Sequence, residues 1–338
     1  MAVLFMDSCD HLSTVAQLDD KYDPASSASL VIAAAGRFGG TCYEMDNDIE
    51  YLRRDFPSTT TMVMGCSFRM DNANVAMSQF DRLMSLEESA LQHISIGVHY
   101  NRIRVNLGSG SGATIQTTLP MVKSEVWHHL EWKVFLSATV GTVEVWLDGL
   151  QVMNETGQDT TNGGVPEFTQ ARWFGQNSGR DVRYDDLFLD SANLLGESRV
   201  DLIMPDGDGN YTELGTTFPA SPTTHWDKVE ELTPDSDTSY NNGTAVNQRD
   251  TFTMENLTAI TTQTIHAVQQ FCYAKHDGSA TNFSMRFRIS GTDYAGTSQA
   301  LAAAYAYLLE VSDLDPNAGP GAWTETVINA LESGYEEL

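Results

Sequence analysis

The sequence predicts a mainly β protein, an antiparallel β-sandwich followed by a smaller β-rich domain. Short apolar runs recur about every ten residues with turn residues between them, which is typical of all-β sandwiches. Residues 126–152 alternate apolar and polar side chains with the period of a β-strand. The chain of 338 residues also exceeds one typical domain, so we expect two.

Residues 126–152 contain the clearest strand pattern in the chain. Apolar side chains occupy alternate positions in residues 128–135 and again in residues 143–147. The pair Asp148-Gly149 can then supply the positive φ angles of a tight turn. We therefore expect three antiparallel strands that follow one another as a meander.

Alternation and turn residues predict further strands on both sides of this meander. In the first half of the chain they are expected at residues 1–10, 59–71, 92–98, 102–107, 171–175 and 181–190, with a short helix or turn at 11–22. In the second half they are expected at 252–257, 264–274 and 282–290. Residues 300–309 fit a strand or a helix, and residues 324–331 fit a short helix or a strand.

The composition changes sharply after the first group of strands. Residues 205–247 are rich in Asp, Thr, Ser, Gly and Asn and contain few apolar residues, which indicates a connection between domains. We therefore place the sandwich at residues 1–195, a connecting segment at 196–249 and the smaller β-rich domain at 250–338.

The chain is strongly acidic. Its 19 Lys and Arg residues face 46 Asp and Glu residues, which gives a formal net charge of −27. Such a surface repels phosphate backbones and anionic lipids, so we expect no nucleic-acid partner and no membrane insertion. The acidity is explained by a solvated surface or by binding of a cation or a basic partner.

Targeting and disulfide signals are weak in this sequence. The first residues, MAVLFMDSCDHL, lack the basic region of a signal peptide, and no apolar run is long enough to span a membrane. Cys9, Cys42, Cys66 and Cys272 lie far apart without a CxxC pair. We therefore expect free, buried thiols in a protein made in a reducing cytosol.

The sequence carries no recognisable catalytic or cofactor-binding motif. Glu144 and Asp148 have the wrong spacing for the paired carboxylates of a glycanase, and Asp148 falls in a turn. No G-x-S-x-G, H-E-x-x-H or phosphate-binding G-x-x-x-x-G-K-[ST] string occurs. We therefore expect no catalytic residues, no bound cofactor and no enzymatic activity.

One string resembles the start of a calcium-binding loop. Asp206, Asp208 and Asn210 place oxygen atoms at alternate positions, so these three residues are the candidate metal ligands. The rest of the loop template fails, because its sixth position is Tyr211 and its twelfth is Thr217. A polar turn is the alternative to a calcium site.

Aromatic and histidine side chains offer other candidate contacts. Trp146, Tyr100, Tyr184 and Trp173 can stack on sugar rings if they are exposed, or pack across strands if they are not. His128 and His129 fall on opposite faces of one strand, so they cannot bind one ion together. We expect one of the two histidines to be buried beside Trp127 and the other to be solvated.

Several strings, taken in order, resemble a known family. A strand that opens with Trp127, followed by the V-x-V-W-L-D-G string of residues 143–149, resembles the hairpins of laminin-G-like and concanavalin-A-like jelly-roll domains. Large virion proteins of tailed bacteriophages have strings similar to LFMDSCDH (4–11), GR-x-GG (36–40), YDDLFLD (184–190), RV-x-x-x-x-PDGDG (199–209), HWDKVE (225–230) and DP with WT (315–316 and 323–324). The sequence departs from that pattern at Ser8-Cys9 and at Glu213-Leu214.

This resemblance implies a jelly-roll structural protein of the bacteriophage virion, associated with the tail or a tail fibre. It implies a homo-oligomer that assembles with copies of itself and with other virion proteins, after synthesis in the host cytoplasm, and that displays a surface for host glycans. A capsid-surface decoration protein, a carbohydrate-active enzyme and a glycan-binding module are the alternatives.

Overall fold

The protein is mainly β and folds as two compact units. The computed structural model describes residues 3–23, 30–71, 80–89, 91–109, 111–176, 180–220, 224–257, 263–278, 282–319 and 321–338. Contacts divide the chain into Met1–Val200 and Asp201–Leu338, which we call the first and second units. The first unit is an antiparallel β-sandwich and the second is β-rich, which confirms the predicted fold class.

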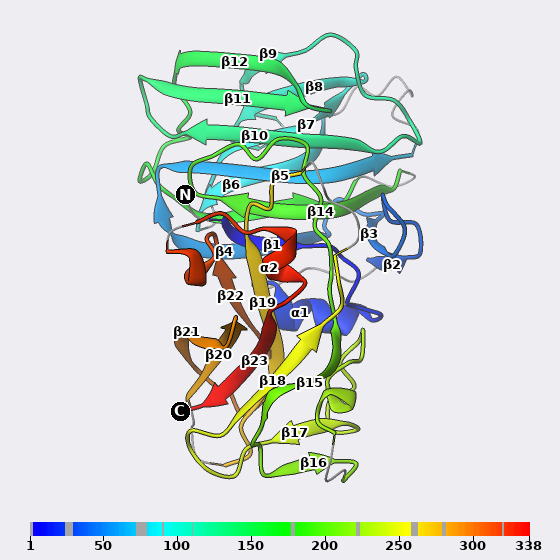
Figure 1. Ribbon diagram of the computed structural model, residues 1–338. Coiled ribbons are helices and arrows are strands. Elements are labelled where there is room, and N and C mark those ends of the chain that lie inside the picture. Colours follow the sequence, from blue (N-terminus) through cyan, green and yellow to red (C-terminus); the bar gives the residue numbers. More distant parts are fainter. Residues whose placement is uncertain are drawn as a thin grey trace. The chain divides into compact units, whose positions relative to one another are not determined.

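An eight-stranded sheet forms one layer of the first unit (Figure 1). Its order is β12-β11-β10-β5-β14-β3-β2, and β1 pairs with β14. The strands are β1 (Val3–Asp7), β2 (Val31–Ala33), β3 (Cys42–Met45), β5 (Thr61–Met70), β10 (His128–Phe135), β11 (Gly141–Leu147), β12 (Leu150–Gln158) and β14 (Val182–Asp190). The short helices η1 (Val15–Gln17) and α1 (Leu18–Lys21) follow β1.

A six-stranded sheet forms the second layer, and β6, β7 and β8 lie behind the first sheet in Figure 1. Its order is β4-β13-β6-β7-β8-β9. The strands are β4 (Tyr51–Thr59), β6 (Asp81–Glu88), β7 (Leu91–His99), β8 (Arg102–Leu107), β9 (Thr114–Thr117) and β13 (Phe168–Phe174). Cys66 Sγ of β5 lies 3.8 Å from Met84 Sδ of β6, so the inner faces of the two sheets meet in one core.

The predicted meander is confirmed as β10, β11 and β12. Leu130, Trp132 and Val134 point into the core and are fully buried, because their alternate spacing places them on one face of β10. Asp148 and Gly149 have φ angles of 50° and 74° in the turn between β11 and β12, as the Asp-Gly pair predicts.

Both adjacent histidines of β10 are buried, so the expectation that one would be solvated is wrong. His128 Nδ1 lies 2.7 Å from Asp148 Oδ2 in the turn, and its Nε2 accepts a hydrogen bond from Lys123 N. His129 stacks on Phe188 with ring centroids 6.2 Å apart. Burial, and then the charge of Arg37, lowers the pKa of His129 to about 4.

A buried ion pair ties α1 to β1. Lys21 Nζ lies 2.9 Å from Asp7 Oδ1, and both side chains are almost fully buried. The hydroxyls of Tyr22 and Tyr43 donate hydrogen bonds to Asp7 Oδ2. Burial alone would raise the pKa of Asp7, but the charges of Lys21 and His11 lower it to about 2. A buried charge needs such partners to be tolerated.

All four cysteines are free, and Cys9, Cys42 and Cys66 are buried. Burial raises the pKa of Cys42 to about 12, which keeps that thiol protonated. Among the described residues, no helix combines the length and apolar character that a membrane span requires.

The second unit is built on a five-stranded antiparallel sheet of order β15-β18-β23-β20-β21. Its strands are β15 (Pro205–Thr212), β18 (Arg249–Met254), β20 (Asn282–Ile289), β21 (Thr292–Ala300) and β23 (Glu332–Glu337). Two smaller pairs are β16 (Thr216–Phe218) with β17 (Tyr240–Asn242), and β19 (Val268–Ala274) with β22 (Ala306–Ser312). The helices are η2 (Trp226–Lys228), η3 (Pro316–Ala318) and α2 (Glu325–Ile328).

The structure corrects one sequence-based expectation for this unit and decides between helix and strand for two further segments. Residues 201–249, expected to connect two domains, belong to the second unit and contribute β15, β16 and β17. The Asp- and Gly-rich strand β15 pairs with β18 through backbone groups, which need no apolar side chains. Residues 306–309, which also fitted a helix, form part of strand β22, whereas α2 is a helix that Thr324 caps through its side chain.

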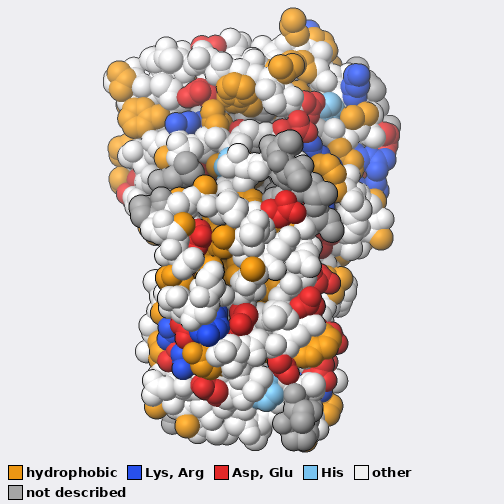
Figure 2. Space-filling model, in the orientation of Figure 1, with side chains coloured by type: hydrophobic (Ala, Val, Ile, Leu, Met, Phe, Trp, Pro, Cys, Tyr) orange, Lys and Arg blue, Asp and Glu red, His pale blue; other side chains and the backbone are white. Residues whose placement is uncertain are grey.

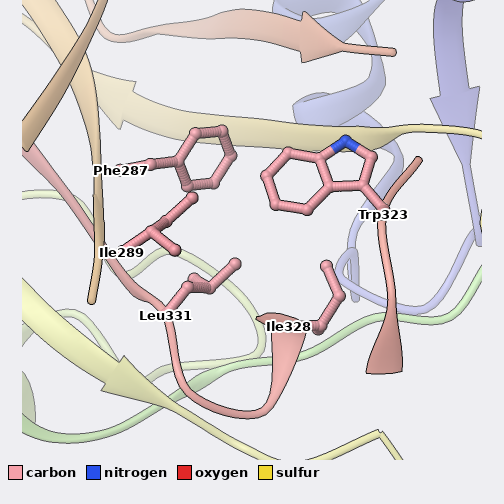
Figure 3. Packing of buried hydrophobic residues seen from close by; sticks show 5 residues of the cluster. All are labelled: Phe287, Ile289, Trp323, Ile328 and Leu331. Atoms are coloured by element: carbon pink, nitrogen blue, oxygen red, sulfur yellow. The ribbon is translucent and has the colours of Figure 1, made fainter. Parts of the chain in front are cut away.

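An apolar cluster forms a core of the second unit (Figure 3). The Phe287 and Trp323 rings meet edge to face with centroids 5.4 Å apart, and Ile289, Ile328 and Leu331 complete the cluster. Trp323 Nε1 donates a hydrogen bond to Ser312 O, so the indole buries its apolar ring while its polar atom is satisfied.

We expect replacement of Trp323 by Ala to lower the free energy of unfolding by about 3–5 kcal/mol, because it leaves a cavity in this core. Denaturant-induced unfolding followed by circular dichroism measures the change. The control Leu314→Ala truncates a side chain that is 47% exposed and should shift stability by less than about 0.5 kcal/mol. Equal effects of the two substitutions would contradict the proposed core.

Glu131 on the outer face of β10 holds the chain after β14. Its two carboxylate oxygens accept hydrogen bonds from Leu195 N and Gly196 N, and the side chain is almost fully buried. Burial raises its pKa from 4.5 to about 7, and the two N–H donors offset only part of this effect. The folded protein therefore keeps a proton on Glu131 at pH values where the unfolded chain has lost it.

This pKa shift predicts a pH dependence with a definite sign. Between pH 4.5 and about 7 the folded state binds more protons at Glu131 than the unfolded state, so stability falls as pH rises through this window. Over that range the wild type should lose up to roughly 3 kcal/mol more than Glu131→Gln, which cannot ionise. Parallel stability curves for the two proteins between about pH 4 and pH 8 would contradict the raised pKa of Glu131.

Candidate functional site

The outer face of the six-stranded sheet collects polar and basic side chains. Ile94, Ile96 and Val98 of β7 and Ile103 and Val105 of β8 point into the core and are buried. The alternate residues lie on the opposite side of the sheet: Tyr51, Arg53 and Asp55 of β4; Gln170, Arg172 and Phe174 of β13; Arg82, Ser85 and Glu87 of β6; His93, Ser95, Gly97 and His99 of β7; and Arg102, Arg104 and Asn106 of β8. The buried members of this set are Ser85, Glu87, His93, Ser95, Gly97, Asn106 and Phe174, and its arginines are partly exposed. We call this surface the arginine face, after its five arginines.

Strand register brings these arginines together from distant parts of the chain. One cross-strand row runs Arg53, Arg172, Ser85, Ser95, Asn106, and the next row contains Arg82, Gly97 and Arg104. A bulge interrupts β6 between Arg82 and Met84. A Cβ atom at Gly97 would lie 2.0 Å from Asp81 O, so only glycine allows the strands to approach here.

A buried carboxylate organises one side of this face. Arg172 Nε lies 3.2 Å from Glu87 Oε2, and the Glu87 side chain is only 1% exposed. Ser85 Oγ and Gln92 Nε2 donate to Glu87 Oε1 over 2.5 and 2.8 Å. Gln92 Oε1 in turn accepts from Arg82 Nη1 over 2.8 Å. One network therefore fixes both Arg82 and Arg172.

Aromatic rings support three of the arginines. The guanidinium carbon of Arg82 lies 3.5 Å from the centroid of the Phe174 ring, and that of Arg172 lies 4.7 Å from Tyr51. Arg104 lies over Phe80 at 5.6 Å. Stacking holds a guanidinium plane in place while its N–H edges stay available for hydrogen bonds.

The face is basic within a very acidic chain. Its five arginines are opposed there by two carboxylates, Asp55 and Glu87, which pair with Arg53 and Arg172. Burial, and then the charges of Arg104 and Arg102, lowers the pKa of His99, so this imidazole is neutral near pH 7. On the eight-stranded sheet, by contrast, Arg69 pairs with Glu125 and Arg183 with Glu44. Figure 2, which views that sheet, shows basic and acidic side chains beside one another.

The calcium candidates lie in the second unit and are engaged in structural hydrogen bonds. Asp206 Oδ1 accepts from Thr253 Oγ1, and Asp208 Oδ1 accepts from His225 N and Trp226 N at the start of η2. Asn210 N donates to Glu332 Oε2. In the part of the chain that the structure describes, no group of three or more His, Cys, Asp or Glu residues could hold a metal ion. Calcium binding by Asp206, Asp208 and Asn210 remains a prediction.

The aromatic candidates divide between core and surface. Tyr184 and Trp173 are fully buried, and the Tyr184 hydroxyl donates to the carbonyl oxygens of Leu83 and Phe174, so neither residue can stack on a ligand. Trp146 is half-buried on β11. Tyr100 is 45% exposed in the turn between β7 and β8, at one end of the arginine face.

A small acidic cavity of about 160 Å³ lies elsewhere in the first unit, between Asp10, Asp185 and Asp186. Burial, and then the charge of Asp186, raises the pKa of Asp185 to about 8. These carboxylates already accept hydrogen bonds from the protein. Thr41 N donates to Asp10, Arg37 N donates to Asp185 and Ser67 Oγ donates to Asp186. We interpret the cluster as a structural tie for the loop that contains Arg37.

The sequence did not identify the arginine face. Strands β4 and β6, which carry Arg53 and Arg82, were not predicted, and β13 was placed only in part. The one local signal was the Arg102-x-Arg104 pair, because residues two apart on a strand share a face. The other three arginines join that pair only through strand pairing.

Two packed antiparallel sheets define the first unit as an antiparallel β-sandwich, and one of its outer surfaces is polar and basic. No family model matches the sequence, and no curated protein matches it. Similar solved structures include the cellulose induced protein Cip1, with 14% identity, a TM-score of 0.42 and coverage of 56% of this chain and 98% of that chain. The alginate lyase Aly36B follows with 11% identity, a TM-score of 0.37 and coverage of 54% and 92%.

The carbohydrate recognition domain of Emp46p, in its metal-free form, is a third similar structure. It has 8% identity, a TM-score of 0.36 and coverage of 56% of this chain and 100% of that chain. Similarity at this level concerns the arrangement of strands, and a sandwich fold by itself does not determine function. The residues of the arginine face therefore provide the evidence for a function.

We expect Glu87→Gln to lower the free energy of unfolding by roughly 1–3 kcal/mol, because it removes the charge that balances Arg172 in a buried network. The matched control is Asp55→Asn, which breaks the neighbouring Arg53 pair at a carboxylate that is 44% exposed. That change should cost less than about 1 kcal/mol. Chemical denaturation of both variants measures the difference, and a larger effect of the Asp55 substitution would contradict the role of Glu87.

Proposed function

We propose that the first unit is a glycan-binding module whose ligand lies along the arginine face. The observation that carries this proposal is the concentration of fixed, hydrogen-bonding arginines on one sheet surface of a chain with a net charge of −27. Guanidinium groups donate to sugar hydroxyl and acid oxygens, and their rigid fork loses little freedom when it binds.

Neighbouring side chains support a sugar ligand. Gln170 adds a partly exposed amide group to the face, and an amide can both donate to and accept from hydroxyl groups. The half-exposed ring of Tyr100, at the end of β7, can cover the apolar side of a sugar. A surface with several polar donors and one exposed ring suits a chain of sugars better than an apolar ligand.

We propose binding without bond cleavage. Paired carboxylates that act as acid and base have to be free to exchange protons. The two carboxylates of the arginine face, Glu87 and Asp55, are instead held in ion pairs by Arg172 and Arg53. Their positions support a structural role for these groups.

A virion location remains a separate prediction that rests on the sequence strings alone. A glycan-binding sandwich on a bacteriophage tail or fibre would touch the host surface, so the two proposals are compatible. Labelling virions with an antibody against this chain and imaging them tests the location. Label on the tail supports the tail assignment, label on the head supports the decoration alternative, and the absence of label contradicts both.

Binding to a glycan array tests the proposed function. We expect the wild-type chain to bind polysaccharides and Arg104→Glu, which reverses a charge on β8, to lose at least about tenfold in affinity. Arg69→Glu makes the same charge change on the outer face of the eight-stranded sheet and should bind like the wild type. Both variants should keep the wild-type circular dichroism spectrum.

Two results would contradict this proposal. Equal losses for the Arg104 and Arg69 variants would remove the arginine face as the site. Release of shorter sugars during incubation with a bound polysaccharide would show turnover, and the chain would then be a carbohydrate-active enzyme.

A further inference from the structure

We infer that the glycan on the arginine face is a carboxylated polysaccharide, a polyuronate, whose acid groups are bound by Arg82, Arg102 and Arg104. This inference rests on the proposed function and specifies its ligand.

Pairing separates these three arginines from most others in the chain. Arg37, Arg53, Arg54, Arg69, Arg172, Arg180, Arg183, Arg249, Arg286 and Arg288 each lie within ion-pair distance of an Asp or Glu. Within the described ranges, Arg82, Arg102 and Arg104 form no ion pair with a carboxylate. In a chain with 46 acidic residues, three unpaired guanidinium groups on one sheet face are a marked exception.

The three arginines also retain most of their hydrogen-bonding capacity. Each donates to one neutral acceptor: Arg82 to Gln92 Oε1 over 2.8 Å, Arg102 to Thr118 O over 3.1 Å and Arg104 to Asn106 Oδ1 over 2.7 Å. A guanidinium has about five N–H donors, so about four remain on Arg102 and on Arg104. The Nε atom of Arg82 is buried, so about three remain accessible on that side chain. These bonds and the rings beneath Arg82 and Arg104 orient the groups without neutralising their charge.

The face itself contains an example of the expected contact. Arg53 Nη2 donates a hydrogen bond to Asp55 Oδ2 over 3.1 Å, and Arg53 Nε lies 2.9 Å from Asp55 Oδ1 without a hydrogen bond. Hydrogen bonds between a guanidinium and a carboxylate are among the stronger ones in proteins. A uronate carboxylate offers the same planar pair of oxygens to the unpaired arginines.

The spacing and total charge favour a polysaccharide over a nucleic acid. Arg82 and Arg104 lie on strands two apart and in register through Gly97, which separates their backbones by about 10 Å. A polyuronate carries separate single charges, one on each acidic sugar. A nucleic acid has a phosphate roughly every 1.7 Å along its axis, and the surrounding net charge of −27 would repel it.

Titration calorimetry with matched polymers tests this inference. The probes are polygalacturonate and polymannuronate, the same polymers after chemical reduction of their carboxyl groups, and dextran sulfate. We expect both polyuronates to bind, the reduced polymers to bind at least about tenfold more weakly, and affinity to fall as sodium chloride is added. Dextran sulfate tests whether charge alone is sufficient for binding, because a guanidinium fork can also donate to two oxygens of a tetrahedral oxyanion.

Variants separate charge from geometry. Arg104→Gln and Arg102→Gln should each weaken polyuronate binding by at least about tenfold, and Arg104→Lys, which keeps the charge but loses the fork, should give a smaller loss. Arg69→Gln removes the same charge from the other sheet and should bind normally. An unchanged melting temperature for each variant shows that the fold is intact.

The outcomes distinguish the inference from the function on which it rests. Equal affinity for polyuronates and their reduced forms, or binding of neutral glycans alone, would overturn the carboxylate assignment and leave a glycan-binding module. Stronger binding of dextran sulfate than of either polyuronate would also overturn it. Failure to bind any glycan would overturn the proposed function itself.

Discussion

The arginine face depends on the buried carboxylate of Glu87. A carboxylate that is only 1% exposed needs charged and hydrogen-bonding partners, and Arg172, Ser85 and Gln92 supply them. Gln92 also accepts a hydrogen bond from Arg82, so the network around one buried carboxylate holds two guanidinium groups in place. The two carboxylates of the face, Glu87 and Asp55, already pair with Arg172 and Arg53. In the described part of the chain, the charges of Arg82, Arg102 and Arg104 therefore stay unpaired.

Charge in this protein is arranged differently on the two sheets of the sandwich. On the eight-stranded sheet Arg69 and Arg183 are neutralised by acidic neighbours, which suits a solvated surface. On the six-stranded sheet Arg82, Arg102 and Arg104 carry hydrogen bonds to neutral acceptors instead. A fold that buries one face of each sheet leaves two outer surfaces, and among the described residues the arginines of these two surfaces differ in whether a carboxylate pairs with them.

The sequence predicted much of the fold because its evidence is local. The alternation around Trp132 and the Asp148-Gly149 turn each depend on residues close together in the chain, and both are confirmed. Its errors have physical reasons as well. Strand β15, formed from Asp, Gly and Asn, pairs through its backbone and gives no apolar pattern, so it was assigned to a connection. Burial of both His128 and His129 depends on Asp148 and Phe188, which contact them through the tertiary fold.

The sequence by itself determined that this chain is a β-sandwich with a second β-rich unit, because strand periodicity and turn residues are local patterns within short segments. Only the tertiary structure decided where the arginines of the first unit meet. Arg53, Arg82, Arg104 and Arg172 lie on four strands, and alternation tells which side of its own strand each occupies but not which strands are neighbours. Neighbours are chosen by packing of buried side chains such as Trp173 and Ile96 between the sheets. The arginine face is therefore a product of strand order and register, which no local sequence pattern can predict.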